Sequence, residues 1–300
     1  MTSIIDETKH LIANHRVKIV RIFDDVFVYR VDDWLKEFAE RWPKEIGLPF
    51  VCLLRIELLD EQLVSSLKKA GCITVFPAID SGVDEVRVRM LRRKMTNEKM
   101  EKGFELLRKN NIKTFTNTML GLPYTSIEQD IESVRFNIKV NPEIPNFSIF
   151  TPFPGTDLGN YCIQAGLYDT EKTPLDQLKV RMRSVLNCFT EEQKDIQVCI
   201  LQLAIFAIKM PVLERVILNK LIYGPPYKVY FIAHYLLETY LLTRALRWNR
   251  TFAEYVFMFK EMFSHILYGY TNVRRKRQLG KKGSSIDRAS PVKIEYAICS

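Results

Sequence analysis

The sequence predicts an α/β protein, in which helices alternate with the strands of a parallel sheet and a helical region follows. Three observations support this prediction. Short apolar, β-branched runs alternate with helical patterns at intervals of roughly 25–40 residues up to about residue 170. The runs are nearly continuously apolar, which is typical of strands covered on both faces. From Pro174 onward the pattern is helical. These patterns alone leave a barrel and a doubly wound sheet as alternatives.

Five runs are predicted to be strands: Val17–Phe23, Phe50–Leu54, Cys72–Ile79, Lys113–Leu120 and Asn146–Phe150. The helices predicted between them are Trp34–Arg41, Glu61–Lys69, Asn97–Lys109 and Ile127–Val140. Each begins after a side chain that can accept a hydrogen bond from the first turn, namely Asp32 or Asp33, Asp60, Thr96, and Thr125 or Ser126. Pro77 removes a backbone donor from the third run, which is unusual in a central strand.

The charge is unevenly divided along a chain of ordinary globular composition. Hydrophobic residues make up 47% and charged residues 26%, which excludes a disordered or disulfide-scaffold protein. Residues 1–170 hold 23 Lys and Arg against 24 Asp and Glu, whereas residues 171–300 hold 21 against 11. The net charges are therefore −1 and +10. We expect one domain over residues 1–170, a helical domain over 171–272 and a basic, disordered tail over 273–300.

The cysteines and the apolar stretches restrict the cellular setting. No two of the six cysteines are spaced as C-x-x-C or C-x-x-x-C, and no histidine pattern predicts a metal site. Scattered thiols are typical of a reduced, cytosolic protein. The N-terminus has no signal-peptide core, and the most apolar stretch, Ile196–Ile208, is too short to span a bilayer. The sequence thus predicts a cytoplasmic protein, with peripheral membrane contact as an alternative.

Polar residues and glycine turns follow all five predicted strands. They are Asp24 and Asp25, Arg55 and Glu57, the turn Asp80-Ser81-Gly82, the turn Gly121-Leu122-Pro123, and the segment 151–156. In parallel α/β folds the carboxyl ends of the strands form the ligand face. Each of these residue types also serves turns and helix caps for purely local reasons. Their recurrence after successive strands favours a small-molecule site.

Several motifs occur in the order known from one family. They are F-D-D-V-F at 23–27, P-F-V-C-L-L-R at 49–55, I-D-S-G at 79–82, L-R-R-K-M-T at 91–96, M-L-G-L-P at 119–123 and S-I-F-T-P-F-P-G-T at 148–156. This set resembles the radical S-adenosylmethionine (radical SAM) enzymes over residues 3–168, and more narrowly the branch that often carries a cobalamin-binding domain. The resemblance implies a partial (β/α)6 TIM-like barrel with strands 2–6 present. It also implies a [4Fe-4S] cluster and S-adenosylmethionine, which generate a 5′-deoxyadenosyl radical for C–H abstraction or radical methylation.

The resemblance also implies roles for the residues that follow the strands. Asp24 and Asp25 correspond to polar groups near the methionine ammonium of the cofactor, for which a carboxylate is a strong acceptor. Asp80 and Ser81 occupy a turn that helps to hold the cofactor, and Arg55 is placed to meet a carboxylate. The turn Gly121-Leu122-Pro123 lets the backbone approach the adenosine. No catalytic residue is implied.

The sequence departs from the family pattern in ways that bear on activity. The C-x-x-x-C-x-x-C loop that holds the cluster is absent, as is the family's first strand, so we expect no cluster on this chain. Two interpretations stay open. The chain is the downstream part of a split or truncated enzyme, with the cluster loop, and any cobalamin domain, on an upstream partner. Or it is a degenerate, non-catalytic binding module. The sequence does not specify a substrate.

The second half predicts further helices at Leu178–Phe189, Thr190–Met210, Val212–Leu221, Tyr230–Trp248 and Phe252–Tyr268. They are rich in apolar residues and basic on their polar faces. A helical domain packed on the barrel is one interpretation. The other is a surface for anionic membranes, with Arg244, Arg247 and Arg250 near Trp248 and Phe252. The basic run 274–282 suits a solvated tail or anionic lipid, and nucleic acid is not predicted as a partner.

Overall fold

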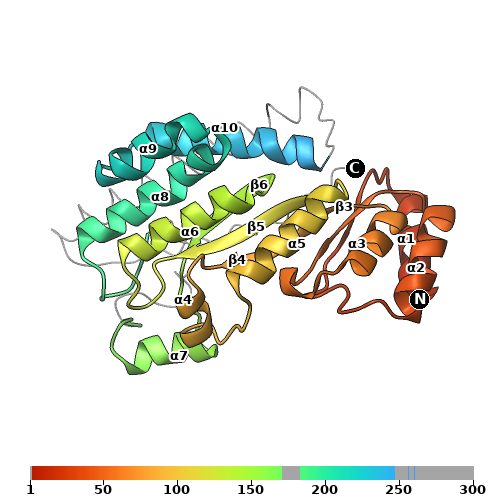
Figure 1. The fold of residues 1–300 in the computed structure, drawn as a ribbon, viewed down its shortest axis with the longest axis horizontal. Helices are drawn as coiled ribbons and strands as arrows, with labels where there is room; N and C mark the ends of the chain where they lie inside the picture. The colour runs from red at the N-terminus through yellow and green to blue at the C-terminus, as the bar shows by residue number, and fades with distance from the viewer. Residues whose placement is uncertain (1, 171–182, 247–255, 257–259, 261–300) are drawn as a thin grey trace, which may run out of the picture. The chain divides into compact units, whose positions relative to one another are not determined.

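The computed structural model describes residues 2–170, 183–246, 256 and 260 (Figure 1). Residues 1–247 form one compact unit and residues 248–300 a second, and the architecture below is that of the first. Its strands are β1 (Val20–Ile22), β2 (Phe50–Leu53), β3 (Cys72–Phe76), β4 (Ala78–Asp80), β5 (Lys113–Leu120) and β6 (Ile144–Ile149). The helices before β6 are α1 (Thr2–Asn14), α2 (Asp33–Glu45), η1 (Ile56–Leu58), α3 (Glu61–Ala70), α4 (Asp84–Arg89), α5 (Asn97–Lys109) and α6 (Ile127–Val140). Those after it are α7 (Asp157–Gln164), α8 (Glu191–Lys209), α9 (Pro211–Asn219), η3 (Leu221–Tyr223) and α10 (Lys228–Ala245).

All strand pairs in the described residues are parallel, and the strands lie side by side in chain order. β3 and β4 both pair with β5, and they are two parts of one strand that Pro77 interrupts. Five consecutive parallel strands with intervening helices confirm the predicted α/β fold of the TIM-barrel type, with a helical region after it. The division into domains at residue 170 stays a prediction.

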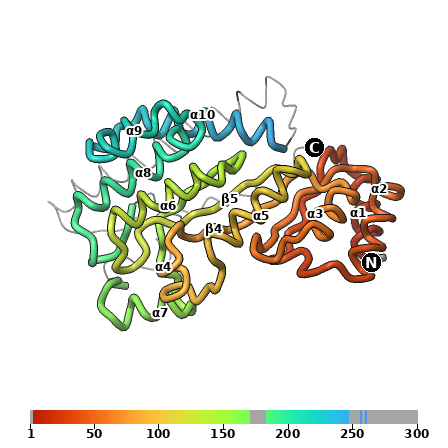
Figure 2. The backbone as a smooth tube through the Cα atoms, in the orientation of Figure 1, coloured from red at the N-terminus to blue at the C-terminus, as the bar shows by residue number. Residues whose placement is uncertain are grey.

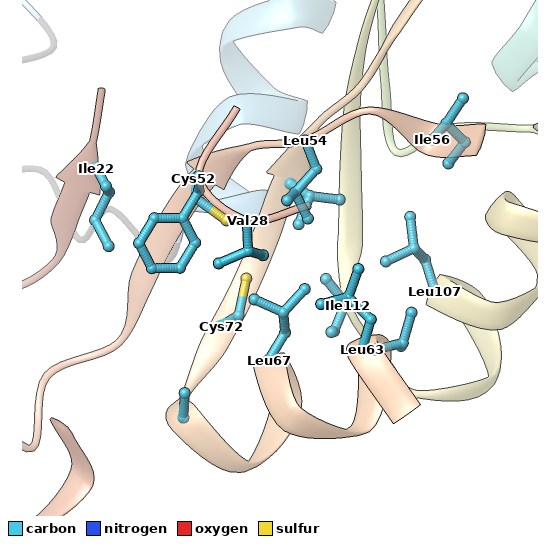
Figure 3. Packing of buried hydrophobic residues seen from close by; sticks show 14 of the residues in the cluster. Ile22, Val28, Cys52, Leu54, Ile56, Leu63, Leu67, Cys72, Leu107 and Ile112 are labelled. Atoms are coloured by element: carbon cyan, nitrogen blue, oxygen red, sulfur yellow. The ribbon is translucent and has the colours of Figure 1, made fainter. Parts of the chain in front are cut away.

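Local signals explain where the helices begin and end. Asp60 Oδ1 accepts the Leu63 amide at 2.7 Å, and Gly71 ends the same helix in the left-handed conformation (φ 98°). At the start of α6, Ser126 and Gln129 form the capping box, which decides between the two alternatives that the sequence left open. Residues of α1, α2, α3, α5 and α6 join residues of β1–β3 in one apolar cluster, and Figure 3 shows part of it, with Cys52 and Cys72.

The helices after β6 extend the core beyond the predicted barrel. α8 packs against α6 and β6, and α9 and α10 pack against α8, as the tube of Figure 2 also shows. At the end of α10, Lys113 Nζ donates to Arg244 O at 2.7 Å and Thr74 Oγ1 to Ala245 O at 3.1 Å. These bonds satisfy carbonyls that the helix leaves without partners and tie α10 to the sheet. None of the described helices has the length and apolar character needed to cross a membrane.

The prediction of a helix over Leu178–Phe189 is wrong for the residues of that range that the structure describes. Residues 183–189 are irregular, with a turn at 187–188. The Asn187 amide donates to Leu167 O at 2.8 Å and not to a carbonyl one helical turn earlier. The first part of that prediction, almost all of the helix predicted over Phe252–Tyr268, and the basic tail lie outside the described residues.

Candidate functional site

The loop after β1 carries two carboxylates that have no partner in the described part of the chain. Asp24 and Asp25 are exposed, and the loop is held to β2 by a bond from the Phe27 amide to Leu53 O at 3.0 Å. The ring of Phe27 packs edge-on against Phe38 and Phe50, so the end of the loop is anchored in the core. Both carboxylates are therefore available to a cation from outside.

The loop after β2 pairs its own charges. Arg55 Nε donates to Glu57 Oε1 at 2.7 Å, and a second guanidinium nitrogen reaches the same oxygen. Glu57 is mostly buried and Arg55 is more exposed. Arg55 is thus paired within the chain with a carboxylate two positions away, and its predicted contact with the cofactor stays a prediction.

Asp80 ends β4 in the left-handed conformation (φ 61°), and its carboxyl is buried. Its Oδ2 lies 2.9 Å from Arg93 Nε, an ion pair whose geometry is not that of a hydrogen bond, so this buried oxygen has no donor in the structure. Burial raises the pKa of Asp80, while the charges of Arg93 and Arg87 oppose the rise. A buried acceptor without a donor is costly by itself and suits a ligand that supplies one.

Arg87 fixes the turn that follows Asp80, a role that the sequence analysis missed. Its fully buried guanidinium donates to Met95 O at 3.2 Å and Asn97 Oδ1 at 2.7 Å, and also to Ser81 O and Asp84. Such a fork of donors holds several segments in one geometry. No spacing in the sequence distinguishes Arg87 from the neighbouring surface arginines, because its partners are brought by the fold.

Ser81 and the glycine after it pack directly against α6. Ser81 Oγ accepts the Val83 amide at 3.2 Å, and Ser133 Oγ accepts the Gly82 amide at 2.9 Å. A Cβ on Gly82 would lie 2.6 Å from Ser133 Cα, so only glycine permits this approach. Ser81 is buried and serves the turn itself, which leaves its neighbour Asp80 as the polar group with unused capacity.

The turn Gly121-Leu122-Pro123 is held from behind by a buried carboxyl. The Gly121 amide donates to both oxygens of Asp130 at 3.1 and 3.3 Å, and Gln197 Nε2 of α8 donates to Asp130 Oδ2 at 3.4 Å. Burial raises the pKa of Asp130 to about 7. Leu122 and Pro123 are buried as well. The predicted site residues after β5 thus act as a rigid turn locked to the C-terminal helices.

A polar group on the sheet was also missed. Asn117 is exposed on β5, and its Oδ1 lies 3.1 Å from Asn146 Nδ2 and 3.4 Å from Ser148 Oγ on β6. Its neighbour Thr116 is buried and bonds to α6, so Asn117 lies on the opposite face of the sheet. The signal was present in the alternation Thr-Asn-Thr within β5. This face offers amide and hydroxyl groups to a ligand.

Comparison with known proteins gives the family. A family model described as the radical SAM superfamily matches residues 2–136, which include Asp24, Asp25, Arg55 and the Asp80 turn. This part of the chain belongs to the radical SAM superfamily. The match covers β1 to β5 of the sheet and the loops that carry those residues.

The radical SAM relatives are distant and longer. The anaerobic magnesium-protoporphyrin IX monomethyl ester cyclase of Rubrivivax gelatinosus is 24% identical, over 52% of this chain and 28% of its own. An uncharacterized methyltransferase of Pyrococcus horikoshii is 21% identical, over 55% of this chain and 36% of its own. The chain thus spans about a third of the curated relatives it matches. A solved structure also aligns, that of the radical S-adenosylmethionine methyltransferase TsrM of Kitasatospora setae with cobalamin and a [4Fe-4S] cluster bound. The TM-score is 0.48 and the identity 20%, over 55% of this chain and 31% of TsrM.

The described residues do not fit the iron–sulfur cluster of the superfamily. Among them, no group of three or more His, Cys, Asp or Glu side chains could hold a metal ion. Their five cysteines are free, and four are buried. Burial and the adjacent Cys72 thiol raise the pKa of Cys52, which keeps it protonated, whereas cluster ligands are thiolates.

Proposed function

We propose that this chain supplies the S-adenosylmethionine-binding face of a radical SAM enzyme and is inactive alone. When bound beside a cluster in such an enzyme, S-adenosylmethionine supplies the 5′-deoxyadenosyl radical for C–H abstraction or radical methylation. The cluster loop, and cobalamin if the enzyme uses it, belong in this proposal to an upstream partner. The superfamily match over residues 2–136 supports the proposal. Everything beyond that match rests on the residues at the carboxyl ends of the strands.

The observation that carries the proposal is the set of unsatisfied carboxylates on this face. Asp24 and Asp25 have no partner among the described residues, and Asp80 Oδ2 is buried without a hydrogen-bond donor. S-adenosylmethionine carries an ammonium and two ribose hydroxyls, all of them donors. We assign the ammonium to the exposed pair and a ribose hydroxyl to Asp80, because charge-assisted bonds to a carboxylate are the strong ones.

The other residues of the face orient the cofactor and exclude water. Arg55 is more exposed than Glu57, and its guanidinium would bind the methionine carboxylate while it stays paired with Glu57. The buried turn Gly121-Leu122-Pro123, held by Asp130, gives the adenine side of the face a rigid support. Such preorganised positioning is the protein's contribution to a reaction whose chemistry comes from the cofactor.

Titration calorimetry with S-adenosylmethionine tests the binding face. The wild-type chain is expected to bind, and Asp25→Ala and Asp80→Ala each to weaken binding by about tenfold or more, the effect of losing a charge-assisted hydrogen bond. Asp6→Ala on α1, where the carboxylate is exposed away from the strand ends, is the matched control and should bind as the wild type does. Absence of binding at about 1 mM ligand contradicts the proposal.

Anaerobic reconstitution with iron and sulfide tests the second part. We expect no absorption band near 400 nm and no stoichiometric iron on this chain, because in the described residues no three metal-binding side chains lie together. About four irons per chain with that band contradict the proposed division of labour. The alternative function is a non-catalytic module that keeps the fold and docks through its helical half. It predicts neither cofactor binding nor a cluster.

A further inference from the structure

The outer surface of the C-terminal helices is apolar. Of the 17 large hydrophobic side chains that are exposed in the described residues, nine lie between positions 210 and 240. They are Met210, Val212, Leu213, Val216, Tyr223, Tyr227, Val229, Leu236 and Tyr240, and we call them the α9–α10 surface. α9 and α10 both pack against α8, and Figure 1 draws them on the same side of it. Concentrations of this kind mark interaction sites.

Three large apolar side chains lie on the solvent-facing side of α10, between Lys228 and Arg244 at its ends. Val229, Leu236 and Tyr240 are separated by seven and four residues, so they lie on one side of the helix. Their exposed fractions are 61%, 44% and 55%. A surface helix ordinarily turns its polar side to water, so this stripe is the reverse of the usual pattern.

Two polar residues in the middle of α10 point inward instead. His234 Nδ1 lies 3.1 Å from Gln202 O of α8, and His234 Nε2 lies 3.8 Å from Glu238 Oε2. Both side chains are mostly buried. Because His234 and Glu238 meet the protein while the apolar stripe of α10 meets the outside, the environment outside the middle of this helix is expected to be apolar.

Helix α9 repeats the arrangement on a smaller scale. Val212 and Val216 are one turn apart and are 86% and 48% exposed, while Ile217 and Leu218 are buried in the cluster that contains α8. The helix therefore has two apolar sides. The inner side packs against α8, and the outer side is exposed in the described part of the structure. Packing within the unit does not account for the outer side.

The charges around these apolar residues are mostly basic, and Glu214 of α9 is a partly exposed exception. Between positions 210 and 246 the exposed charged residues are Arg215, Lys220, Lys228 and Arg244, and all are basic. The Arg244 guanidinium lies 5.7 Å from the Tyr240 ring centroid. Tyrosines with adjacent cations suit the boundary between lipid headgroups and acyl chains. Residues 247–300 continue the sequence with 11 Lys and Arg against four Asp and Glu.

We propose that the α9–α10 surface binds in the plane of an anionic lipid bilayer, with Val212, Val229 and Leu236 in the headgroup–acyl boundary. A protein partner is the less suitable occupant, because lysine is depleted at protein interfaces, whereas it is favoured at anionic membranes. No described helix can span a bilayer, so the contact lies on the membrane. The proposal is independent of cofactor binding by the sheet.

Vesicle flotation of the full chain tests the apolar contribution. Binding is expected to vesicles of phosphatidylcholine with phosphatidylglycerol and to be much weaker with phosphatidylcholine alone. The double variant Leu236→Ser, Tyr240→Ser should weaken binding by about tenfold or more, since both side chains lose apolar contact. The control variant Val88→Ser, Tyr161→Ser removes two comparably exposed side chains elsewhere and should bind as the wild type does. Circular dichroism verifies that both variants are folded.

The charges are tested separately. Arg215→Gln and Lys220→Gln should each weaken binding to the anionic vesicles by about fivefold. No vesicle binding, or equal binding by the wild type and the Leu236→Ser, Tyr240→Ser variant, overturns the proposal. The second result would assign binding to the basic sequence beyond residue 246. Sedimentation gives a further outcome that would overturn the proposal. If the wild type is a dimer, the double variant is a monomer and neither binds vesicles, the surface belongs to a contact with a second copy.

Discussion

Replacing Asp130 by asparagine tests how the turn at residues 121–123 is held. Asp130 is 3% exposed, and the Gly121 amide and Gln197 Nε2 are its hydrogen-bond donors. Burial raises its pKa to about 7 from an ordinary 3.8, and the two donors oppose the rise only in part. Asparagine keeps an acceptor for the Gly121 amide and has no charge to bury.

The expected effect depends on pH. Because the pKa of Asp130 is higher in the folded than in the unfolded chain, the folded chain retains a proton that the unfolded chain has released. The contribution of Asp130 to the stability of the wild type is therefore largest below the pKa of Asp130 in the unfolded chain. It is lost as the pH rises towards the pKa of Asp130 in the folded chain. The loss is ~1.4 kcal/mol for each pH unit between them. From pH 5 to pH 8 it amounts to about 2.5 kcal/mol, which the asparagine variant does not lose.

Urea unfolding at pH 5 and pH 8 measures this difference. All other titrating groups are shared and cancel when the two proteins are compared at the same pH. Asp130→Asn should gain about 2.5 kcal/mol relative to the wild type between the two pH values. Asp33→Asn, where the side chain is fully exposed, controls for the change of residue type. A difference between variant and wild type that is the same at both pH values would refute a buried, neutral Asp130.

Three further predictions concern the turn after Asp80. Gly82→Ala should destabilise the fold by about 1–3 kcal/mol in urea unfolding, because the added Cβ meets the backbone of α6. It should cost more than Gly155→Ala, where φ is +84° but the space is open. Equal costs would contradict the packing argument. Arg87→Leu should cost about 3 kcal/mol, since several acceptors lose one buried donor, and a cost below 1 would contradict this. Arg93→Gln should raise the pKa of Asp80 further, which ¹³C titration of the carboxyl measures; an unchanged pKa would show that the ion pair has no influence.

The strands and helix ends could be predicted because their causes are local. The apolar run at 113–120 became β5 with the same bounds, and α3 begins after Asp60 as predicted. Pro77 was recognised as unusual for a central strand, and the strand is divided there because proline offers no amide to the ladder. In each case a few neighbouring residues decide the conformation.

The contacts that hold the site could not be predicted, because they join distant segments. Asp130 and Gln197 are 67 positions apart, and in the sequence Gln197 only interrupts an apolar helix. That interruption was the signal, since a glutamine on a buried side needs a partner. Similarly, the composition of α10 predicts a helix but not which side faces the protein. His234 decides it by meeting the carbonyl of Gln202.

The ion pair at Asp80 determines how the proposed cofactor site should respond to pH. A ligand donor at Asp80 Oδ2 has to share it with Arg93, which is the more exposed partner, with 42% of its side chain exposed against 8% for Asp80. Burial raises the pKa of Asp80 and the guanidinium opposes the rise only in part, so wild-type affinity for a donor should fall as the pH is lowered. In Arg93→Gln the carboxyl protonates more readily, so the same fall should begin at a higher pH. Calorimetry of both proteins at two pH values measures this, and parallel profiles would separate Asp80 from the binding of S-adenosylmethionine.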